Sequence, residues 1–307
     1  MKNTENTAGI QPIRTPINHR IDFVTIISVD GANPNGDPLG DNMPRTDLMG
    51  RGEISAVCIK HKLRNRLDAF FRDHGMECDE ILITAADTPD RKATIEGRID
   101  AKNDGAVMKL VKDKSVPNVD KAMEMCNSFR DVRTFGYVLP IPGISLGIRG
   151  PVSMTDAKSI KPISPIRQQI TKCISTSASG NKSEGEKGSD TMGNRYKVDG
   201  AVYVLKGSIS AELAQRTGFS EEDAEALKNA IMTMFDGDES AARPAGSMAV
   251  EELYWFVHNS KLGQYPVKTV HNSVQVTPTN TAPFFKSEFN KTDIPELTVE
   301  VLHPSSN

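Results

Sequence analysis

Residues 21–71 constrain the fold most, because they pass from an apolar segment through a turn-rich loop into a basic helical pattern. Residues 21–29 read IDFVTIISV and predict a strand apolar enough for the centre of a sheet. Residues 30–52 contain eight glycines and prolines and predict a long loop. Residues 54–72 repeat apolar side chains at helical spacing and predict a helix. This order places backbone amides and cations at one sheet edge, where a phosphate backbone can lie.

Charge is distributed unevenly along the chain. The formal net charge of −3 over 307 residues speaks against a nucleic-acid partner. Residues 45–72 nevertheless contain seven Lys or Arg against three acids, and residues 212–252 contain ten acids against three Lys or Arg. This asymmetry fits a subunit that binds an anion on one side. Two ordinary solvated faces would give the same counts, so both interpretations stay open.

The predicted helix carries cations on both sides of its apolar face. Lys60 and Arg64 lie on one side, and Lys62 and Arg66 lie on the other. Only one side can face a ligand at the sheet edge, so we expect half of these charges to point into solvent. We assign Lys60 and Arg64 to the ligand side, where alanine substitutions should leave the fold intact.

Composition excludes several classes of protein. With 37% hydrophobic and 25% charged residues, the chain can bury a core and is not globally disordered. No apolar run approaches the ~20 residues of a membrane helix, and residues 1–20 do not read as a signal peptide. The four cysteines form no CxxC pair (Cys58, Cys78, Cys126 and Cys173). We therefore expect a cytoplasmic protein with free thiols, no cofactor and no membrane partner.

The remaining elements predict an α+β fold around a largely antiparallel sheet. We expect strands at residues 132–139, 144–154, 198–209 and 253–258, a helix at 220–235 capped by Ser220, and no strong period after residue 266. Residues 79–130 read as polar helices with apolar residues too sparse for a second core. Residues 159–197 alternate on each side of a Gly/Ser-rich tip and predict a projecting hairpin. This order fits a split β-α-β sheet of the ferredoxin type.

The loop segment NPNGDP at residues 33–38 admits a calcium loop, a structural turn or a phosphate cradle. Calcium is excluded, because Gly31 and Asn42 occupy two positions that require carboxylates. Asn-Gly and Asp-Pro are strong turn formers, while the backbone amides of such a loop can also bind phosphate. The turn and the phosphate cradle both stay open.

Catalysis has weak support in the sequence. The six histidines form no HxxxH or HExxH pair, and no GxSxG motif occurs. The loop acids Asp37, Asp41 and Asp47 could hold a metal for RNA cleavage, but acids in such loops more often form turns. We therefore expect no catalytic residue and no metal site.

Two further basic features have open roles. Arg149 stands near glycines in GIRGPV, where it can contact phosphate or protect an edge strand from aggregation. The predicted hairpin carries seven Lys or Arg against three acids. Such a basic arm suits a clamp on a nucleic-acid strand, and a solvated loop explains it equally well.

Seven segments together resemble the backbone subunit family of type I-C CRISPR surveillance complexes (Cascade). In chain order they are FVTIISVDGANPNGDP, NMPRTD, ISAVCIKHKLRNRL, DVRTFG at 131–136, GIRGPV at 147–152, MGNRYKV at 192–198 and ARPAG…LYWFVHNSKLG at 242–263. Each segment alone is a weak signal. Their order is specific, and the resemblance covers residues 20–265.

The resemblance implies an RNA-recognition-motif-like (ferredoxin-like) palm with an antiparallel sheet, at residues 20–72, 131–158 and 198–270. It implies a helical finger insertion at 73–130 and a thumb hairpin at 159–197, with a flexible arm at 1–19 and a tail at 271–307. Such subunits line up along one CRISPR RNA, and each thumb displaces a base at regular intervals. The remaining bases pair with target DNA, so base pairing carries the selectivity.

The resemblance further implies a non-catalytic, RNA-binding role in antiviral defence. The implied partners are CRISPR RNA, the target DNA strand, further copies of the chain, a guide-processing subunit, a large subunit and a recruited helicase-nuclease. The implied RNA-binding residues are Asn33, Asn35, Gly36, Arg45, Ser55, Lys60, Arg64, Arg149, Arg167 and Lys172. The acidic segment at 212–252 would meet the basic surface of a neighbouring subunit.

Two other functions stay open as alternatives. Related backbone subunits of type III systems cleave RNA with a metal ion, and Asp37 would be the corresponding acid here. A small-molecule binder with a similar sheet would need a convergent polar pocket, which the sequence does not reveal.

Overall fold

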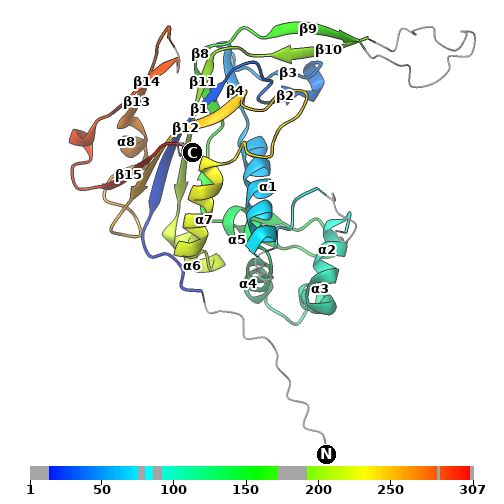
Figure 1. Ribbon diagram of the computed structural model, residues 1–307. Coiled ribbons are helices and arrows are strands. Elements are labelled where there is room, and N and C mark those ends of the chain that lie inside the picture. The colour runs from blue at the N-terminus through cyan, green and yellow to red at the C-terminus, as the bar shows by residue number, and fades with distance from the viewer. Residues whose placement is uncertain (1–13, 75–79, 86–91, 172–191, 282–283, 305–307) are drawn as a thin grey trace, which may run out of the picture.

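A computed structural model describes residues 14–74, 80–85, 92–171, 192–281 and 284–304. At its centre lies a sheet with strand order β15-β12-β1-β11-β8-β4, and β7 also pairs with β11 (Figure 1). The strands are β1 (Ile21–Val29), β4 (Arg51–Ile54), β7 (Val152–Met154), β8 (Ala157–Pro162), β11 (Ala201–Ile209), β12 (Met248–Val257) and β15 (Thr298–Leu302). All pairings within this sheet are antiparallel. The predicted mixed α/β fold with a large antiparallel sheet is confirmed.

The first strand, β1, lies in the middle of the sheet and is buried along nearly its whole length. Its residues alternate between two clusters, since successive side chains of a strand point to opposite faces. Ile21, Phe23 and Ile27 pack with α1 (Ala56–His74), α6 (Ala211–Thr217) and α7 (Glu221–Met232). Val24 and Ile26 pack with α8 (Val267–Asn272), β13 (Val274–Pro278) and β14 (Phe285–Phe289). Both faces of the sheet are therefore covered around β1.

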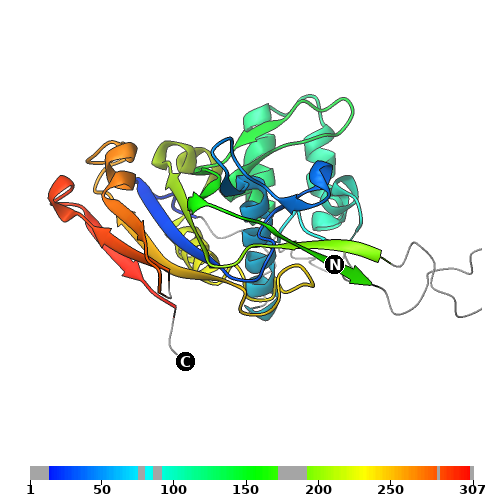
Figure 2. The same cartoon turned by 90° about the horizontal axis from the view of Figure 1, so that it is seen from above.

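A helical lobe stands beyond α1 on the side away from β13 and β14 (Figures 1 and 2). It contains α2 (Ile95–Ala101), the 3-10 helix η3 (Lys102–Gly105), α3 (Ala106–Lys112), α4 (Asn118–Ser128) and α5 (Arg130–Phe135). Its apolar residues form a separate buried cluster, so the expectation that this region lacks a second core is wrong. Val132, Leu139 and Leu146 complete that cluster from beyond residue 130, which a count within residues 79–130 could not include.

The predicted strand at residues 132–139 is wrong over its first half. Residues 130–135 form α5, which ends where Gly136 adopts a φ of 74°. Only β5 (Gly136–Val138) is extended, and it pairs with β6 (Gly147–Arg149) in a separate two-stranded sheet. The predicted strand at 144–154 is likewise divided into β6 and β7.

The projecting hairpin is confirmed for its described part, a two-stranded ribbon of β9 (Ile166–Thr171) and β10 (Met192–Lys197). Figure 2 shows this ribbon extending away from the main sheet. Residues 159–162, predicted as part of the hairpin, belong instead to β8 of the main sheet. The Gly/Ser-rich tip and Lys172 lie outside the described residues.

Several shorter elements complete the structure. The loop after β1 contains β2 (Gly36–Asp37), the 3-10 helix η1 (Pro38–Gly40) and β3 (Met43–Pro44), and η5 (Lys291–Asp293) precedes β15. Residues after 266 have no strong sequence period, yet β15 forms an edge of the main sheet. The predicted cap of α7 is confirmed, because Ser220 and Asp223 form a reciprocal capping box. None of the described helices is both long and apolar enough to cross a membrane.

Candidate nucleic-acid interface

The side chains of Asn33 and Asn35, in the loop that follows β1, form hydrogen bonds with the protein itself. Asn33 is 3% exposed, and its Nδ2 donates to the carbonyl of Asn42 at 2.7 Å. The Oδ1 of Asn35 accepts from the backbone N–H of Ser55 at 2.9 Å. Gly36 leaves no room for a side chain, because a Cβ there would lie 2.0 Å from Oδ1 of Asn42. These residues therefore build the turn, and their described contacts are with the protein itself.

Arg45 is a partly exposed cation of this loop. Its Nη2 donates to Oδ1 of Asp37 at 3.3 Å, and its side chain is 40% exposed. The same carboxylate oxygen of Asp37 accepts from the N–H of Leu39 at 3.2 Å. A solvent-exposed ion pair of this kind contributes little stability, so Arg45 can exchange Asp37 for a phosphate at small cost.

Ser55 caps the start of α1. Its Oγ accepts from the N–H of Cys58 at 3.2 Å, and the N–H of Ala56 donates to Asp156 at 2.7 Å. Two of the amides that an α-helix leaves unpaired at its N-terminus are thereby satisfied within the protein. Ser55 accordingly has a structural role at this position.

The ribbon of β9 and β10 is tied to the loop through Asp41. Its Oδ2 accepts from the hydroxyl of Tyr196 at 3.0 Å and from Nδ2 of Asn194 at 3.2 Å. Burial and the hydrogen bond to Asp41 both raise the pKa of Tyr196. Arg167 extends this network, because its Nη2 donates to Oδ1 of Asn194 at 3.0 Å. The structure therefore joins Arg167, predicted on the ribbon, to the loop that contains Arg45, through an aspartate whose role the sequence did not reveal.

A second group of cations lies between α1 and the helical lobe, around Phe135. Nζ of Lys60 lies 5.7 Å and the guanidinium carbon of Arg64 lies 5.1 Å from the centre of its ring. Both distances are within the range of cation–π interactions. Arg64 also donates from Nε to Oδ2 of Asp131 at 3.0 Å.

This ion pair gives Arg64 a structural role in the folded protein. Asp131 is fully buried and also accepts from the N–H groups of Leu82 and Ile83, at 2.8 and 3.0 Å. Burial raises the pKa of Asp131, while Arg64 and the two amides oppose that shift. Alanine at position 64, which the sequence predicts to leave the fold intact, would therefore leave the buried carboxylate of Asp131 without its cation.

Lys60 and Arg149 have no ion pair with any described carboxylate. Burial is the main cause that lowers the pKa of Lys60, and Arg64 adds to it. Arg149 is exposed and lies opposite Gly136 in the β5–β6 pairing. The backbones cross closely here, since a Cβ on Gly150 would lie 2.3 Å from the nitrogen of Gly136. The two cations thus border the junction between Phe135 and Gly136.

The other side of α1 faces protein rather than solvent. Lys62 is buried and forms an ion pair with Asp238, and Nε of Arg66 donates to Oγ1 of Thr233 at 2.8 Å. Arg243 contacts the same Asp238 at 2.8 Å. The expectation that these helix charges point into solvent is wrong.

Some acids of the segment at 212–252 form ion pairs with Lys or Arg side chains of the same chain. Besides Asp238, Asp223 binds Arg133 at 2.8 Å and Arg130 at 3.1 Å, and all three side chains are buried. The opposite charges counted along the sequence therefore partly neutralise each other within one molecule.

The loop acids are each engaged in the local structure, as described above for Asp37 and Asp41. Burial would raise the pKa of Asp47, but hydrogen bonds from Arg51 and Met49 outweigh it and lower the pKa to about 2. Among the residues with described positions, no group of three or more His, Cys, Asp or Glu side chains is arranged to hold a metal ion.

Comparisons with known proteins agree on one family. The family model described as CRISPR-associated protein Cas7 matches residues 19–299. A CRISPR-associated protein Cas7 from Haloferax volcanii is 25% identical over 228 residues, which is 68% of this chain and 62% of that protein. The chain thus spans less than two thirds of the length of this relative.

Two solved structures are also similar to the chain. A chain of a "CRISPR RNA-guided surveillance complex, pre-nicking" is 16% identical with a TM-score of 0.47, covering 80% of this chain and 79% of that one. A chain of a "CRISPR RNA-guided surveillance complex" is 14% identical with a TM-score of 0.43, covering 80% and 71%. Because the family model matches nearly the whole chain, the protein belongs to the CRISPR-associated protein Cas7 family.

Proposed function

We propose that this protein is a non-catalytic, CRISPR RNA-binding backbone subunit of a type I-C Cascade complex. Copies of it would polymerise along the guide in the cytoplasm and present the guide for pairing with target DNA. Family membership and the ordered set of sequence motifs support this role. The structural observation that carries it is a pair of cations without a described acidic partner, Lys60 over the ring of Phe135 and Arg149 opposite the adjacent Gly136.

The strand order supports an RNA-recognition-motif-like palm. Strands β12, β1, β11 and β8 are neighbours in that order, and α1 and α7 pack together against one face. Along the chain the order is β1, α1, β8, β11, α7 and β12, which is the split β-α-β arrangement. On this proposal the lobe of α2 to α5 is the finger, and the ribbon of β9 and β10 is the base of the thumb.

The available contacts suit the backbone of RNA rather than its bases. Lys60, Arg149, Arg45 and Arg167 are cations, and cations bind phosphates without reading sequence. The aromatic ring of Phe135 is 9% exposed, so it supports the neighbouring cations more than it offers a stacking surface. A guide held by its backbone keeps its bases available for pairing.

The proposal is tested by expressing the chain together with the guide-processing subunit, the large subunit and a CRISPR array. We expect a complex that contains several copies of the chain and RNA of defined length, measured by native mass spectrometry and gel analysis. In the double variant Lys60→Gln and Arg149→Gln, we expect the RNA content per copy to fall several-fold.

Lys286→Gln is the matched control, because it removes an exposed charge that pairs with Glu288 on the opposite side of the sheet. Its RNA content should equal that of the wild type. Recovery of the wild-type chain only as an RNA-free monomer would contradict the proposal.

Cleavage by the same complex tests the non-catalytic assignment. With magnesium and RNA complementary to the guide, we expect that RNA to stay intact. Cleavage that Asp37→Ala abolishes would instead favour the type III-like alternative, and RNA retention would then still distinguish a guide-binding subunit from a protein without RNA.

A further inference from the structure

A hollow of about 470 Å³ opens beside residues 206–208 of β11, at the end of that strand away from the ribbon. It is lined by residues 206–208 of β11, by residues 153–155 at the end of β7 and by one side of α8. Lys206 pairs in register with Val24, which packs on the side of the sheet away from α1. The volume falls within the roughly 300–1,000 Å³ of small-molecule sites.

Two lysines approach the hollow from different elements, and neither forms an ion pair with a described carboxylate. Lys206 is half-buried, and its polar neighbour is Oδ1 of Asn272, 3.4 Å from its Nζ. Burial lowers the pKa of Lys206, so its charged form lacks compensation in the free protein. Lys268 is exposed on α8, across the hollow. An anion placed between the two ammonium groups would supply that compensation.

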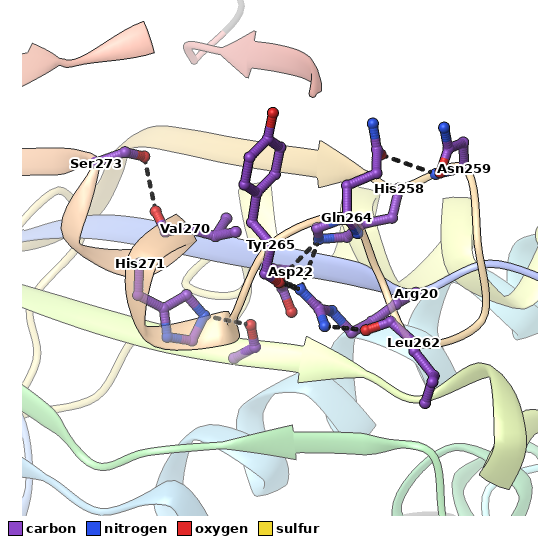
Figure 3. A network of polar contacts seen from close by, with 11 residues as sticks. Arg20, Asp22, His258, Asn259, Leu262, Gln264, Tyr265, Val270, His271 and Ser273 are labelled. Carbon is purple, nitrogen blue, oxygen red and sulfur yellow. Dashed lines mark hydrogen bonds and ion pairs between the residues drawn. The ribbon is translucent and has the colours of Figure 1, made fainter. Parts of the chain in front are cut away.

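The carboxylate of Asp22 does not neutralise these lysines. Asp22 lies opposite Ser208 in the sheet, but its Oδ2 binds Arg20 at 2.9 Å and His258 at 2.9 Å (Figure 3). Nδ1 of His258 accepts from the N–H of Gln264 at 3.0 Å, so Nε2 carries the proton that is donated to Asp22. Oδ2 of Asp22 is therefore bound within this buried network and forms no ion pair with either lysine.

The other side chains around the hollow suit a flat ring with polar edges. Val267 on α8 offers apolar contact, whereas the side chain of Met154 packs with the cluster on the α1 side of the sheet. The hydroxyls of Ser153 and Thr155 donate to the carbonyls of β11 at 3.5 and 3.3 Å, and their lone pairs stay available as acceptors. His271 is held in place, since its Nε2 donates to the carbonyl of Gly207 at 2.8 Å (Figure 3).

We propose that this hollow binds a nucleoside monophosphate unit, with the phosphate between Lys206 and Lys268 and the base against Val267. The hollow lies on the α8 side of the sheet, opposite α1 with Lys60, and the ribbon joins β11 near Ala201, at the other end of that strand. The unit can be a free nucleotide or one nucleotide of a single strand, and both present the same chemistry.

The test is calorimetric titration of the full-length chain with AMP, adenosine and inorganic phosphate. We expect one AMP site, with each fragment bound at least about tenfold more weakly because it lacks either the charge or the ring. Lys206→Gln should weaken AMP binding by about tenfold, the size of one charge-assisted hydrogen bond. Lys268→Gln should weaken it less, because that lysine is exposed.

Lys286→Gln again serves as the control and should bind AMP like the wild type. The proposal is overturned if AMP does not saturate a site, if inorganic phosphate binds as tightly as AMP, or if AMP affinity is unchanged in both lysine variants. Thermal unfolding of each variant verifies its fold, and the exposed position of Lys268 keeps the test valid if Lys206→Gln is unstable.

A competition experiment separates the two sources of the nucleotide. A short single-stranded RNA that displaces AMP from the wild type shows that the hollow accepts a nucleotide within a strand. Failure of the RNA to displace AMP shows that the hollow takes free nucleotides. RNA bound only at the guide interface would leave AMP in place, so this readout is independent of the proposed function.

Discussion

Lys60 and Arg64 show how two cations on the same side of a helix can differ in role. Both lie near Phe135, but Arg64 is bound to the buried carboxylate of Asp131, and Lys60 has no described acidic partner. The helical pattern predicted that they share a side. It could not show the difference, because Asp131 is 67 positions away in the sequence and reaches Arg64 only through the folded lobe.

We predict that Arg64→Ala destabilises the protein by about 3 kcal/mol, because removal of one partner leaves a buried charge uncompensated. Urea denaturation at pH 7 measures this loss. Lys60→Ala is the matched variant on the same side of α1, and we expect it to change the unfolding free energy by less than about 1 kcal/mol. Equal losses for both variants would show that the ion pair with Asp131 is unimportant.

The destabilisation by Arg64→Ala should depend on pH with a defined sign. Without Arg64, burial raises the pKa of Asp131 in the folded state above its unfolded value, which is about 3.9. The unfolded state then loses its proton first, so the variant loses stability as pH rises above about 4. The difference in unfolding free energy between wild type and variant should therefore be larger at pH 7 than at pH 4. A constant difference would mean that Asp131 is not the group responsible.

At the level of secondary-structure elements, the sequence correctly predicted those whose residues are buried almost throughout or at regular helical spacing. The strand β1 and the capped start of α7 are confirmed, and α1 is confirmed within two residues at each end. The error at α5 has a tertiary cause. Its residues are all buried, and Asp131 and Arg133 bind Arg64 of α1 and Asp223 of α7, which are contacts that the local sequence could not show.

The loop residues of the candidate site show the same limit. The sequence predicted a polar, turn-rich loop, and both a turn and a phosphate cradle were compatible with it. Which groups face inward depends on contacts with Asn42 and with the start of α1. The link from Asp41 to the ribbon joins positions 155 residues apart, and no local signal could have indicated it.

We predict that Asp41→Ala loosens the ribbon without unfolding the protein. The variant loses the hydrogen bonds from Asn194 and Tyr196 that connect β10 to the loop. Amide hydrogen exchange of residues 192–197 should accelerate by roughly tenfold, while exchange in β1 stays unchanged. Tyr196→Phe removes one of the two bonds and should give an intermediate rate. Unaltered exchange in both variants would show that strand pairing alone holds the ribbon.

For the whole molecule, the small net charge and an RNA partner are compatible. Many of the cations in residues 45–72 are paired with acids of the same chain, so the electrostatic surface depends on the few that are not. If each copy of the subunit contacts only a few phosphates, a small set of cations without acidic partners is enough to bind the RNA.

We predict that RNA affinity of the isolated chain falls with salt in proportion to these contacts. For single strands the slope of log affinity against log salt is about −0.7 for each phosphate neutralised. The double variant Lys60→Gln and Arg149→Gln should therefore reduce the slope by about 1.4, measured by fluorescence anisotropy with a short RNA. Lys286→Gln should keep the wild-type slope. A weaker affinity with an unchanged slope would show that the two residues do not contact phosphates.

The central sheet is enclosed on both faces around β1, by α1, α6 and α7 on one side and by α8, β13 and β14 on the other. Such a sheet has no open aromatic platform there on which bases could stack and be told apart. Under the proposed function, the chain would accept any guide of suitable length with equal ease. A defence system that must store the sequences of unrelated viruses requires a subunit indifferent to what it holds, and the enclosed sheet would provide that indifference.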